Sequence, residues 1–318
     1  MLEAITSMFK FTPAKKSAIF LSLILGLAAF FRLYRIGDYL TFLGDEGRDV
    51  MVVYNILHGQ FTLLGPTASV GGFFLGPIYY YFMAPFLWLS RYDPVGPAVM
   101  IALLGVATVW LLWRVTKEFF GTVPALIAAA LYAVSPLVIT YSRSSWNPNP
   151  LPFFTLLCLF VLYRAIRDNN IKLFLISGIL FGIMMQLHYL ATFVGVIIVS
   201  YIVIARLLAW RSYKNIFLFL KQLLKDFLSY AVGFLIGFSP FLAFEVRHGF
   251  PNIRSIADFI FNSNDTGNSP QLVHTIGDVG FRLFGRLITS YPSPDHFSWY
   301  MPQLISVWFW LTLFLIAI

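Results

Sequence analysis

The chain has 318 residues, of which 59% are hydrophobic and only 11% are charged, and its formal net charge is +8 at pH 7. Its mean hydropathy of +0.78 is far above that of a water-soluble domain of this size, so a soluble protein is excluded. The single cysteine, Cys158, excludes a disulfide framework and a thiolate metal site. We therefore expect an all-α integral membrane protein, a multi-pass bundle of transmembrane helices.

Apolar stretches separated by charged loops predict eight membrane-spanning helices, because about 20 helical residues cross a hydrocarbon core of roughly 30 Å. The first stretch follows Lys10, Lys15 and Lys16 without a small-residue cleavage site, so we expect it to be retained and not removed as a signal peptide. The last stretch reaches residue 318 without a charged flank, so we treat residues 1–318 as one membrane domain that continues further. The eight predicted spans are residues 18–36, 97–113, 123–140, 151–166, 172–190, 192–208, 227–245 and 302–318.

The distribution of lysine and arginine predicts the orientation of these spans. With a cytoplasmic N-terminus, all eight lysines fall on the cytoplasmic side, in agreement with the positive-inside rule. Residues 37–96 and 246–301 then form two large extracytoplasmic loops. Arginine matches phosphate oxygens with a planar, permanently charged fork, so this outer face is suited to bind a phosphate. Snorkelling of the same side chains to lipid headgroups is the alternative. The cations on the outer side are Arg32, Arg35, Arg48, Arg91, Arg143, Arg247, Arg254, Arg282 and Arg286.

The stretch FLGDEGRDVMVVYNILHGQ, residues 42–60, gathers four charged residues just outside the first predicted span. Its apolar positions are spaced i, i+3, i+4 and i+7, which predicts a helix lying along the membrane. Asp45 lies on the polar side of this helix with Arg48 and Asp49, whereas Glu46 falls beside the apolar stripe. The two adjacent carboxylates are therefore expected to point in different directions, unless Asp45 is the N-cap. Simple capping of the helix dipole by the pair is the structural alternative. The apolar stripe consists of Val50, Val53, Tyr54 and Leu57.

The next segment, GPIYYYFMAPFLWLSRYD over residues 76–93, is apolar enough to be a further span. Counting it as one would turn later positive loops outward and break the charge bias. We therefore predict a helix on the outer surface with its aromatic side against the bilayer.

Two later segments, SPLVITYSR and SPFLAFEVR, each place a proline seven residues before an arginine, Arg143 or Arg247, at the outer end of a predicted span. Proline can kink the last turns of a helix, so we expect both arginines to tilt toward a common centre. His188, at the outer end of another span, is expected at the same depth. Chance recurrence of Ser-Pro near helix ends is the alternative.

The loop after Glu245 contains an Asn/Ser/Gly-rich stretch and then Arg282 and Arg286, one helical turn apart. This part either closes over a substrate or selects an acceptor, and an ordinary solvated surface helix is the alternative. Its histidines share no metal-ligand spacing, so we predict no metal site. They are His248, His274 and His296.

Residues 30 to about 165 resemble the membrane glycosyltransferases of the C-type fold, the group that includes protein O-mannosyltransferases and lipid A aminoarabinose transferases. The resemblance implies a sugar donor linked to a polyprenyl phosphate, an extracytoplasmic reaction that usually inverts the anomeric carbon, and a glycan, lipid or protein acceptor. Nucleic acid is not an expected partner. A metal requirement varies across the fold, and likeness to the mannosyltransferase branch implies none. The resemblance is carried by RLYRIGDYLTFLGDEGRDVMVVYNILHGQF, GPIYYYFMAPFLWL, LLWRVTKEFFG and SPLVITYSRSSWNPNPLPFF, in that order.

The same resemblance makes Asp45 the expected catalytic base, with Glu46 beside it and arginines holding the lipid phosphate. Relatives often carry an aspartate in the loop where this chain has Asn147 and Asn149, and an amide cannot act as a base at neutral pH. They also often carry Lys or His just before Pro77, where this chain has Leu-Gly. Asp45 is therefore the residue expected to act as the base, without a second carboxylate from that loop. The candidate residues for binding the substrate or its phosphate are Arg48, Arg143, Arg247, His188, Tyr79, Asn147 and Asn149.

A membrane transporter or lipid flippase with an arginine-lined outer site is the alternative function, since charges inside a bundle can mark a transport path. The charges of this chain lie at span ends and in loops, which favours the enzyme. A non-catalytic subunit that keeps the fold is a third possibility, and it predicts that Asp45 is dispensable.

Overall fold

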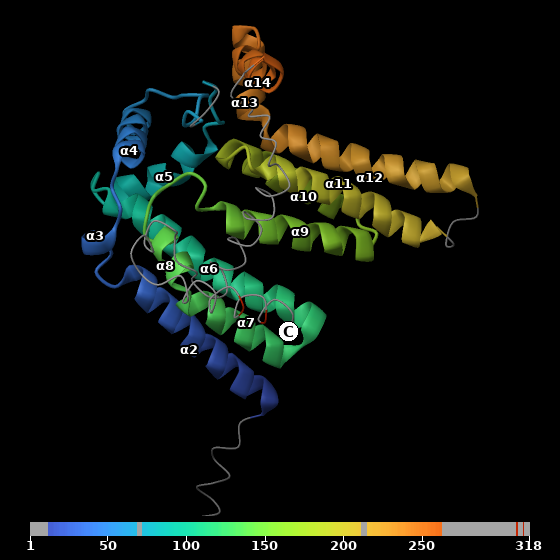
Figure 1. Cartoon of the computed structure of the whole chain (residues 1–318), viewed down its shortest axis with the longest axis horizontal. Helices are drawn as coiled ribbons and strands as arrows, with labels where there is room; N and C mark the ends of the chain where they lie inside the picture. Colours follow the sequence, from blue (N-terminus) through green and yellow to red (C-terminus); the bar gives the residue numbers. More distant parts are fainter. Residues whose placement is uncertain (1–11, 69–71, 211–214, 263–309, 311–313, 315–318) are drawn as a thin grey trace, which may run out of the picture.

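The computed structural model describes residues 12–68, 72–210 and 215–262 and the single positions 310 and 314. Within these ranges the chain forms helices α2 to α14, and extended backbone pairs only at one isolated bridge, between Thr67 and Phe74. The expected all-α helix bundle is therefore confirmed (Figure 1).

The long helices, together with α7, form two neighbouring groups, and the other short helices gather at one end of both (Figure 1). The first group consists of α2 (Pro13–Leu33), α6 (Val95–Phe120) and α7 (Thr122–Val134). The second consists of α9 (Leu151–Arg167), α10 (Ile171–Leu187), α11 (Ala191–Leu208) and α12 (Ile216–Gly237). The short helices are α3 (Ile36–Tyr39), α4 (Gly44–Leu57), α5 (Ile78–Leu89), α8 (Pro136–Tyr141), α13 (Ser239–His248) and α14 (Pro251–Asn262).

Small residues let the long helices approach one another closely, as is typical of helix pairs in membranes. Ala28 of α2, Val109 of α6 and Ala129 of α7 are buried together in the first group. In the second group, a Cβ atom added at Gly233 of α12 would lie 2.0 Å from the carbonyl oxygen of Leu175 in α10. Only glycine fits at this crossing, which brings the two backbones into contact.

Three described helices are long and apolar enough to cross a membrane alone: α2 from Ala14, α6 and α11. The bent pair α12 and α13 is long and apolar enough only when taken together, as one broken span or a re-entrant loop, while α5, α7 and α10 are apolar but shorter. The protein is thus a multi-pass membrane protein, but the expectation that every predicted span is one long, continuous helix is wrong. The predicted span 302–318 lies outside the described residues apart from positions 310 and 314.

The two Ser-Pro sequences break their helices and do not merely kink them. The predicted span 123–140 is divided, because α7 ends at Val134 and α8 begins at Pro136. The predicted helix 227–245 is divided at Ser239, where α12 and α13 meet at 70°. Proline lacks the N–H that a continuous helix needs, and its fixed φ suits the first turn of a new one.

The aromatic segment forms α5, which has 12 residues and is therefore too short to cross the bilayer. It packs against α4 and α6, and Tyr79, Tyr80 and Met83 are buried in that contact. The expectation that its aromatic side faces lipid is wrong for these tyrosines, whereas Trp88, near the end of α5, is 61% exposed.

The described lysines lie at the end of the bundle opposite the short helices (Figure 1). Lys15 and Lys16 are in the first turn of α2, Lys117 is in the last turn of α6, and Lys172 is in the first turn of α10. Lysine is thus kept away from α3, α4, α5, α8 and α13, as predicted for the described part of the chain. The assignment of this lysine-rich end to the cytoplasm stays a prediction.

Candidate active site

The candidate site lies where the short helices gather, around the segment SRSSWNPNP (residues 142–150) that connects α8 to α9. Hydrogen bonds join this segment to α4, to α5 and to the C-terminal end of α10. The acidic stretch, the aromatic stretch and the Ser-Pro motif of the sequence therefore meet in one place.

Glu46 is buried in the first turn of α4, and both of its carboxylate oxygens accept hydrogen bonds. Oε2 accepts from the backbone N–H of Leu43 at 3.0 Å, and Oε1 accepts from the hydroxyl of Ser144 at 2.9 Å. The first bond satisfies an N–H group that the start of a helix leaves free. The second fastens α4 to residues 142–150, so Glu46 holds two parts of the site together.

Asp45 projects from the same turn toward solvent, with 55% of its side chain exposed. Its Oδ1 accepts a hydrogen bond from Nη1 of Arg48 at 3.0 Å. Leu43, not Asp45, is the N-cap of α4. The two adjacent carboxylates thus point in different directions, as predicted, and Asp45 is the exposed one of the two.

The buried face of α4 differs from the predicted apolar stripe. Glu46, Asp49, Val53 and Ile56 are its buried residues, whereas Tyr54 is 40% exposed. The prediction that Asp49 lies on the polar side is therefore wrong. The packed face shares Val53 with the predicted stripe but is shifted toward Asp49, to which α5 supplies a polar partner.

Asp49 is held by Arg48 and by the α5 residue Tyr80. Nε and Nη2 of Arg48 donate to its Oδ1 at 3.0 and 2.8 Å, and the Tyr80 hydroxyl donates to the same oxygen at 3.3 Å. Its Oδ2 is buried without a partner. Burial raises the pKa of Asp49 to about 6, and the charge of Arg48 only partly opposes this rise. Arg48 therefore bridges an exposed aspartate, Asp45, and a buried one.

Residues 142–150 are positioned by two of the predicted substrate-binding residues. The hydroxyls of Tyr79 and Ser145 are 2.8 Å apart and hydrogen-bonded, and the side-chain amide of Asn147 donates to the carbonyl of Leu187 at 2.7 Å. Tyr79 is fully buried and Asn147 is 5% exposed. The structure therefore places both side chains as supports of the loop.

Asn149 and His188 lie near this loop with their polar groups partly engaged. The Asn149 amide donates to the carbonyl of Ser144 at 2.8 Å. His188 follows the last residue of α10, and its Nδ1 accepts from the N–H of Leu190 at 3.2 Å. Burial lowers the pKa of His188, so its neutral form is favoured near neutral pH.

Arg143 and Arg247 are not brought together. Arg143 follows α8, where its guanidinium lies 4.9 Å from the ring centre of Tyr39 and donates to the Tyr34 carbonyl. Arg247 is exposed in the last turn of α13, a helix that Figure 1 shows well away from α8. The two Ser-Pro breaks turn α8 and α13 in different directions, so the expected convergence on one centre is wrong.

A hollow of about 230 Å³ lies between the start of α4 and residues 140–146, and we call it the Asp45 hollow. It is lined by Asp45 and Glu46 on one side and by Tyr141, Ser144 and Trp146 on the other. An exposed carboxylate facing aromatic rings across a small cavity can bind a polar ring and take a proton from a hydroxyl.

The sequence patterns did not single out Ser144, Ser145 or Trp146, although all three lie inside a quoted motif. Two serines before a tryptophan in an Asn/Pro-rich loop are the signal, because such hydroxyls can satisfy buried groups on neighbouring helices. Among the described residues, no three His, Cys, Asp or Glu side chains gather to form a metal-binding group.

Comparison with known proteins identifies the family of this chain. A curated Bacillus subtilis (strain 168) protein named "Putative mannosyltransferase YycA" is 29% identical over 134 residues, which cover 42% of this chain and 20% of that protein. The aligned part thus amounts to about a fifth of that relative's length. The sequence model of the family described as "Dolichyl-phosphate-mannose-protein mannosyltransferase" matches residues 75–244, just over half of the chain, which includes α5 and residues 142–150 but not α4. The chain therefore belongs to the dolichyl-phosphate-mannose-protein mannosyltransferase family.

Proposed function

We propose that this protein transfers a sugar from a polyprenyl-phosphate-linked donor to a hydroxyl-bearing acceptor on the extracytoplasmic face, with Asp45 as the general base. The observation that carries the proposal is that the three carboxylates of α4 differ in burial. Glu46 and Asp49 are buried and engaged by neighbouring side chains, whereas Asp45 is exposed and lines a hollow. Membership of the mannosyltransferase family supports the lipid-linked sugar donor.

The reaction that fits this geometry is a single displacement at the anomeric carbon. Asp45 takes the proton of the acceptor hydroxyl while the hydroxyl oxygen attacks the anomeric carbon. The bond between that carbon and the phosphate oxygen breaks, and polyprenyl phosphate leaves with the electron pair. Attack opposite the leaving group inverts the configuration, and nearby arginines stabilise the charge on the departing phosphate.

The arginines do not contribute equally to this scheme. Arg48 is bound between Asp45 and Asp49 and also donates to the hydroxyl of Thr67 at 3.3 Å, so we assign it to orienting Asp45. Arg143 follows α8, next to the Asp45 hollow, and is the better candidate for the phosphate. Arg247 would contribute only if the donor or acceptor reached across to α13.

Transport is less well supported by the buried charges. The clearest buried ion pair joins Arg206 of α11 to Asp226 of α12 at 2.7 Å, near the lysine-rich end of the helices. Arg206 also donates to Asn169 in the turn between α9 and α10. These bonds connect α11 and α12 to the turn between α9 and α10, so we assign the pair a structural role and call it the Arg206–Asp226 brace.

A direct test uses purified full-length protein in nanodiscs with a mixed acceptor pool. Radiolabelled polyprenyl-phosphate hexoses and pentoses are compared with the corresponding nucleotide sugars. We expect transfer of label only from the lipid-linked donors. Transfer from nucleotide sugars, or movement of the labelled lipid across vesicles without any transfer, would contradict the proposed function.

A further inference from the structure

A cleft of about 650 Å³ lies at the lysine-rich end of the first helix group, between the beginning of α2, the end of α6 and the beginning of α7. These three helices pack against one another. Lys16 of α2 and Lys117 of α6 both line the cleft, and no acidic side chain is among the described residues that line it. The cleft is therefore a cationic site at the end of the bundle opposite the candidate active site.

The two lysines of the cleft have no carboxylate partner. Among the described residues, neither Lys16 nor Lys117 forms an ion pair. Glu118, the sequence neighbour of Lys117, is already held by two arginines. The Lys117 ammonium lies 4.8 Å from the ring centre of Trp113, which also lines the cleft, and this cation–π contact does not neutralise its charge. An anion is therefore the ligand that these charges favour.

The polar and apolar residues of the cleft lie at two depths. Lys16, Lys117 and Thr122 lie in the first turn of α2, the last turn of α6 and the first turn of α7. Four residues further into the bundle, the same three helices line the cleft with Phe20, Trp113 and Leu126. Four residues of a helix span about 6 Å, so a charged layer at the helix ends is followed directly by an apolar layer. This order matches a phosphate headgroup followed by acyl chains.

The rim of the cleft is apolar and exposed. Phe20 on α2 is 56% exposed, and Val123 on α7 is 66% exposed. Because α2 is long and apolar enough to cross the membrane alone, side chains exposed on its surface face lipid. The cleft is therefore open to the bilayer, and a lipid can enter it from the side.

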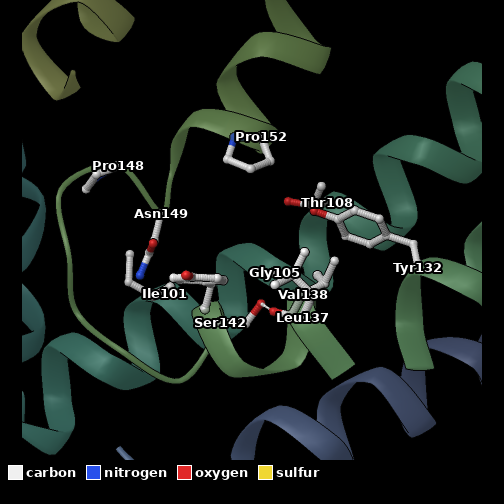
Figure 2. Close-up of a pocket in the computed structure, with 11 residues that line it drawn as sticks. Ile101, Gly105, Thr108, Tyr132, Leu137, Val138, Ser142, Pro148, Asn149 and Pro152 are labelled. Atoms are coloured by element: carbon white, nitrogen blue, oxygen red, sulfur yellow. Dashed lines mark hydrogen bonds between the residues drawn. The ribbon is translucent and has the colours of Figure 1, made fainter. Parts of the chain in front are cut away.

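The cavity shown in Figure 2 lacks this combination of charge and apolar surface. It lies further along α6, beside α8 and the start of α9, and Figure 2 shows Ser142 and Asn149 on one side of it and Tyr132 on the other. No charged side chain is among the described residues that line it. That cavity offers hydrogen bonds to a ligand, whereas the cleft at the lysine-rich end offers positive charge.

We propose that this cleft binds an anionic phospholipid of the surrounding membrane, with Lys16 and Lys117 at the phosphate and Phe20, Trp113 and Leu126 along the acyl chains. Basic pockets between membrane helices bind anionic headgroups, and each lysine near such a headgroup contributes about a fivefold gain in affinity. The bound lipid connects α2, α6 and α7 at the end of the first helix group. This site is independent of the sugar transfer proposed for the opposite end of the bundle.

The test uses the full-length protein in neutral detergent and counts bound lipid by native mass spectrometry. Phosphatidylglycerol is compared with phosphatidylcholine of the same acyl chains and with inorganic phosphate. Lys16→Gln removes one charge from the cleft, and Lys15→Gln is its matched control because Lys15 lies in the same turn but does not line the cleft. Ala18→Phe narrows the cleft, and Ile19→Phe is the control at the next position, which is 41% exposed and does not line it.

We expect the wild type to bind phosphatidylglycerol about tenfold more tightly than phosphatidylcholine, and an equal concentration of inorganic phosphate should not displace the lipid. Lys16→Gln should weaken phosphatidylglycerol binding about fivefold and Lys16→Arg should restore it, while Lys15→Gln should change it less than about twofold. Ala18→Phe should weaken the binding of both lipids, and Ile19→Phe should leave it unchanged.

Three results would overturn the proposal. Equal affinity for the two lipids, or equal losses in Lys15→Gln and Lys16→Gln, would show that the lysines of the cleft do not select an anion. Wild-type binding by Ala18→Phe would place the lipid elsewhere. Displacement of the lipid by an equal concentration of inorganic phosphate would show a site for a bare phosphate group.

Discussion

Replacing Glu46 with alanine tests whether Glu46 has a structural role, in contrast to the catalytic role that we propose for the adjacent Asp45. The change removes the acceptor for the Leu43 N–H and the acceptor for the buried Ser144 hydroxyl. A buried donor left without a partner costs about 1–3 kcal/mol, and the N–H at the exposed start of α4 recovers part of its cost from water. We therefore expect Glu46→Ala to lower the free energy of unfolding by about 2–4 kcal/mol.

The comparison variants sharpen this expectation. Asp45→Ala removes an exposed ion pair with Arg48, which is worth about 0–1 kcal/mol, so the unfolding free energy should hardly change. Glu46→Gln keeps both contacts, since its carbonyl can accept from Leu43 and its amide can donate to Ser144. It should therefore retain most of the stability and most of the sugar transfer.

The assay is unfolding of the full-length protein in detergent, followed by circular dichroism, together with sugar transfer in nanodiscs. A Glu46→Gln protein that is as stable as the wild type but has lost transfer would show that Glu46 takes part in the chemistry. A Glu46→Ala protein of unchanged stability would show that its two hydrogen bonds contribute nothing. The first result would refute a purely structural role for Glu46, and the second would refute its assignment as the residue that fastens α4 to residues 142–150.

Three further predictions concern the rest of the bundle. The pKa of Asp49 is raised to about 6 in the folded protein, so the protonated carboxyl favours the folded state. This contribution to the free energy of unfolding is fully present below about pH 4 and is lost as the pH rises through 6, a change of roughly 3 kcal/mol. Asp49→Asn should remove this change from the pH profile of unfolding. Asp226→Ala leaves Arg206 buried and unpaired and should cost about 3–5 kcal/mol of stability without a specific loss of donor binding; an unchanged unfolding midpoint would contradict the brace. Gly233→Ala, where the new Cβ would meet the Leu175 carbonyl, should lower the unfolding midpoint through overpacking of about 1–3 kcal/mol, and an unchanged midpoint would mean that α10 and α12 do not cross this closely.

Much of the fold follows from apolar runs and charge, because these decide which residues can lie in a bilayer. The runs placed α11 within one residue and located α2 and α6, although α2 begins at Pro13 and α6 continues to Phe120, and lysine placement predicted which helix ends lie together. Single-residue periodicity cannot say whether a proline kinks a helix or ends it. That outcome depends on a tertiary partner such as Arg32, which donates hydrogen bonds to carbonyls that the break leaves without an amide partner.

The candidate site was predictable only in part for a similar reason. The opposite directions of Asp45 and Glu46 follow from helical geometry and a 100° step per residue. The burial of Asp49 does not, because it depends on Arg48 and on Tyr80 from a helix some 30 positions away in sequence. Likewise, Tyr79 and Asn147 were predicted to touch substrate but bond to Ser145 and Leu187 inside the protein.

The most direct test of the account compares Asp45→Asn with Asp38→Asn in the sugar-transfer assay. Both aspartates are exposed, by 55% and 57% of their side chains, and each pairs with an arginine three residues away. Loss of a general base should lower the rate of transfer about 10²–10⁴-fold in Asp45→Asn, while Asp38→Asn should transfer at the wild-type rate. Equal rates in the two folded variants would contradict the claim that Asp45 is the catalytic base.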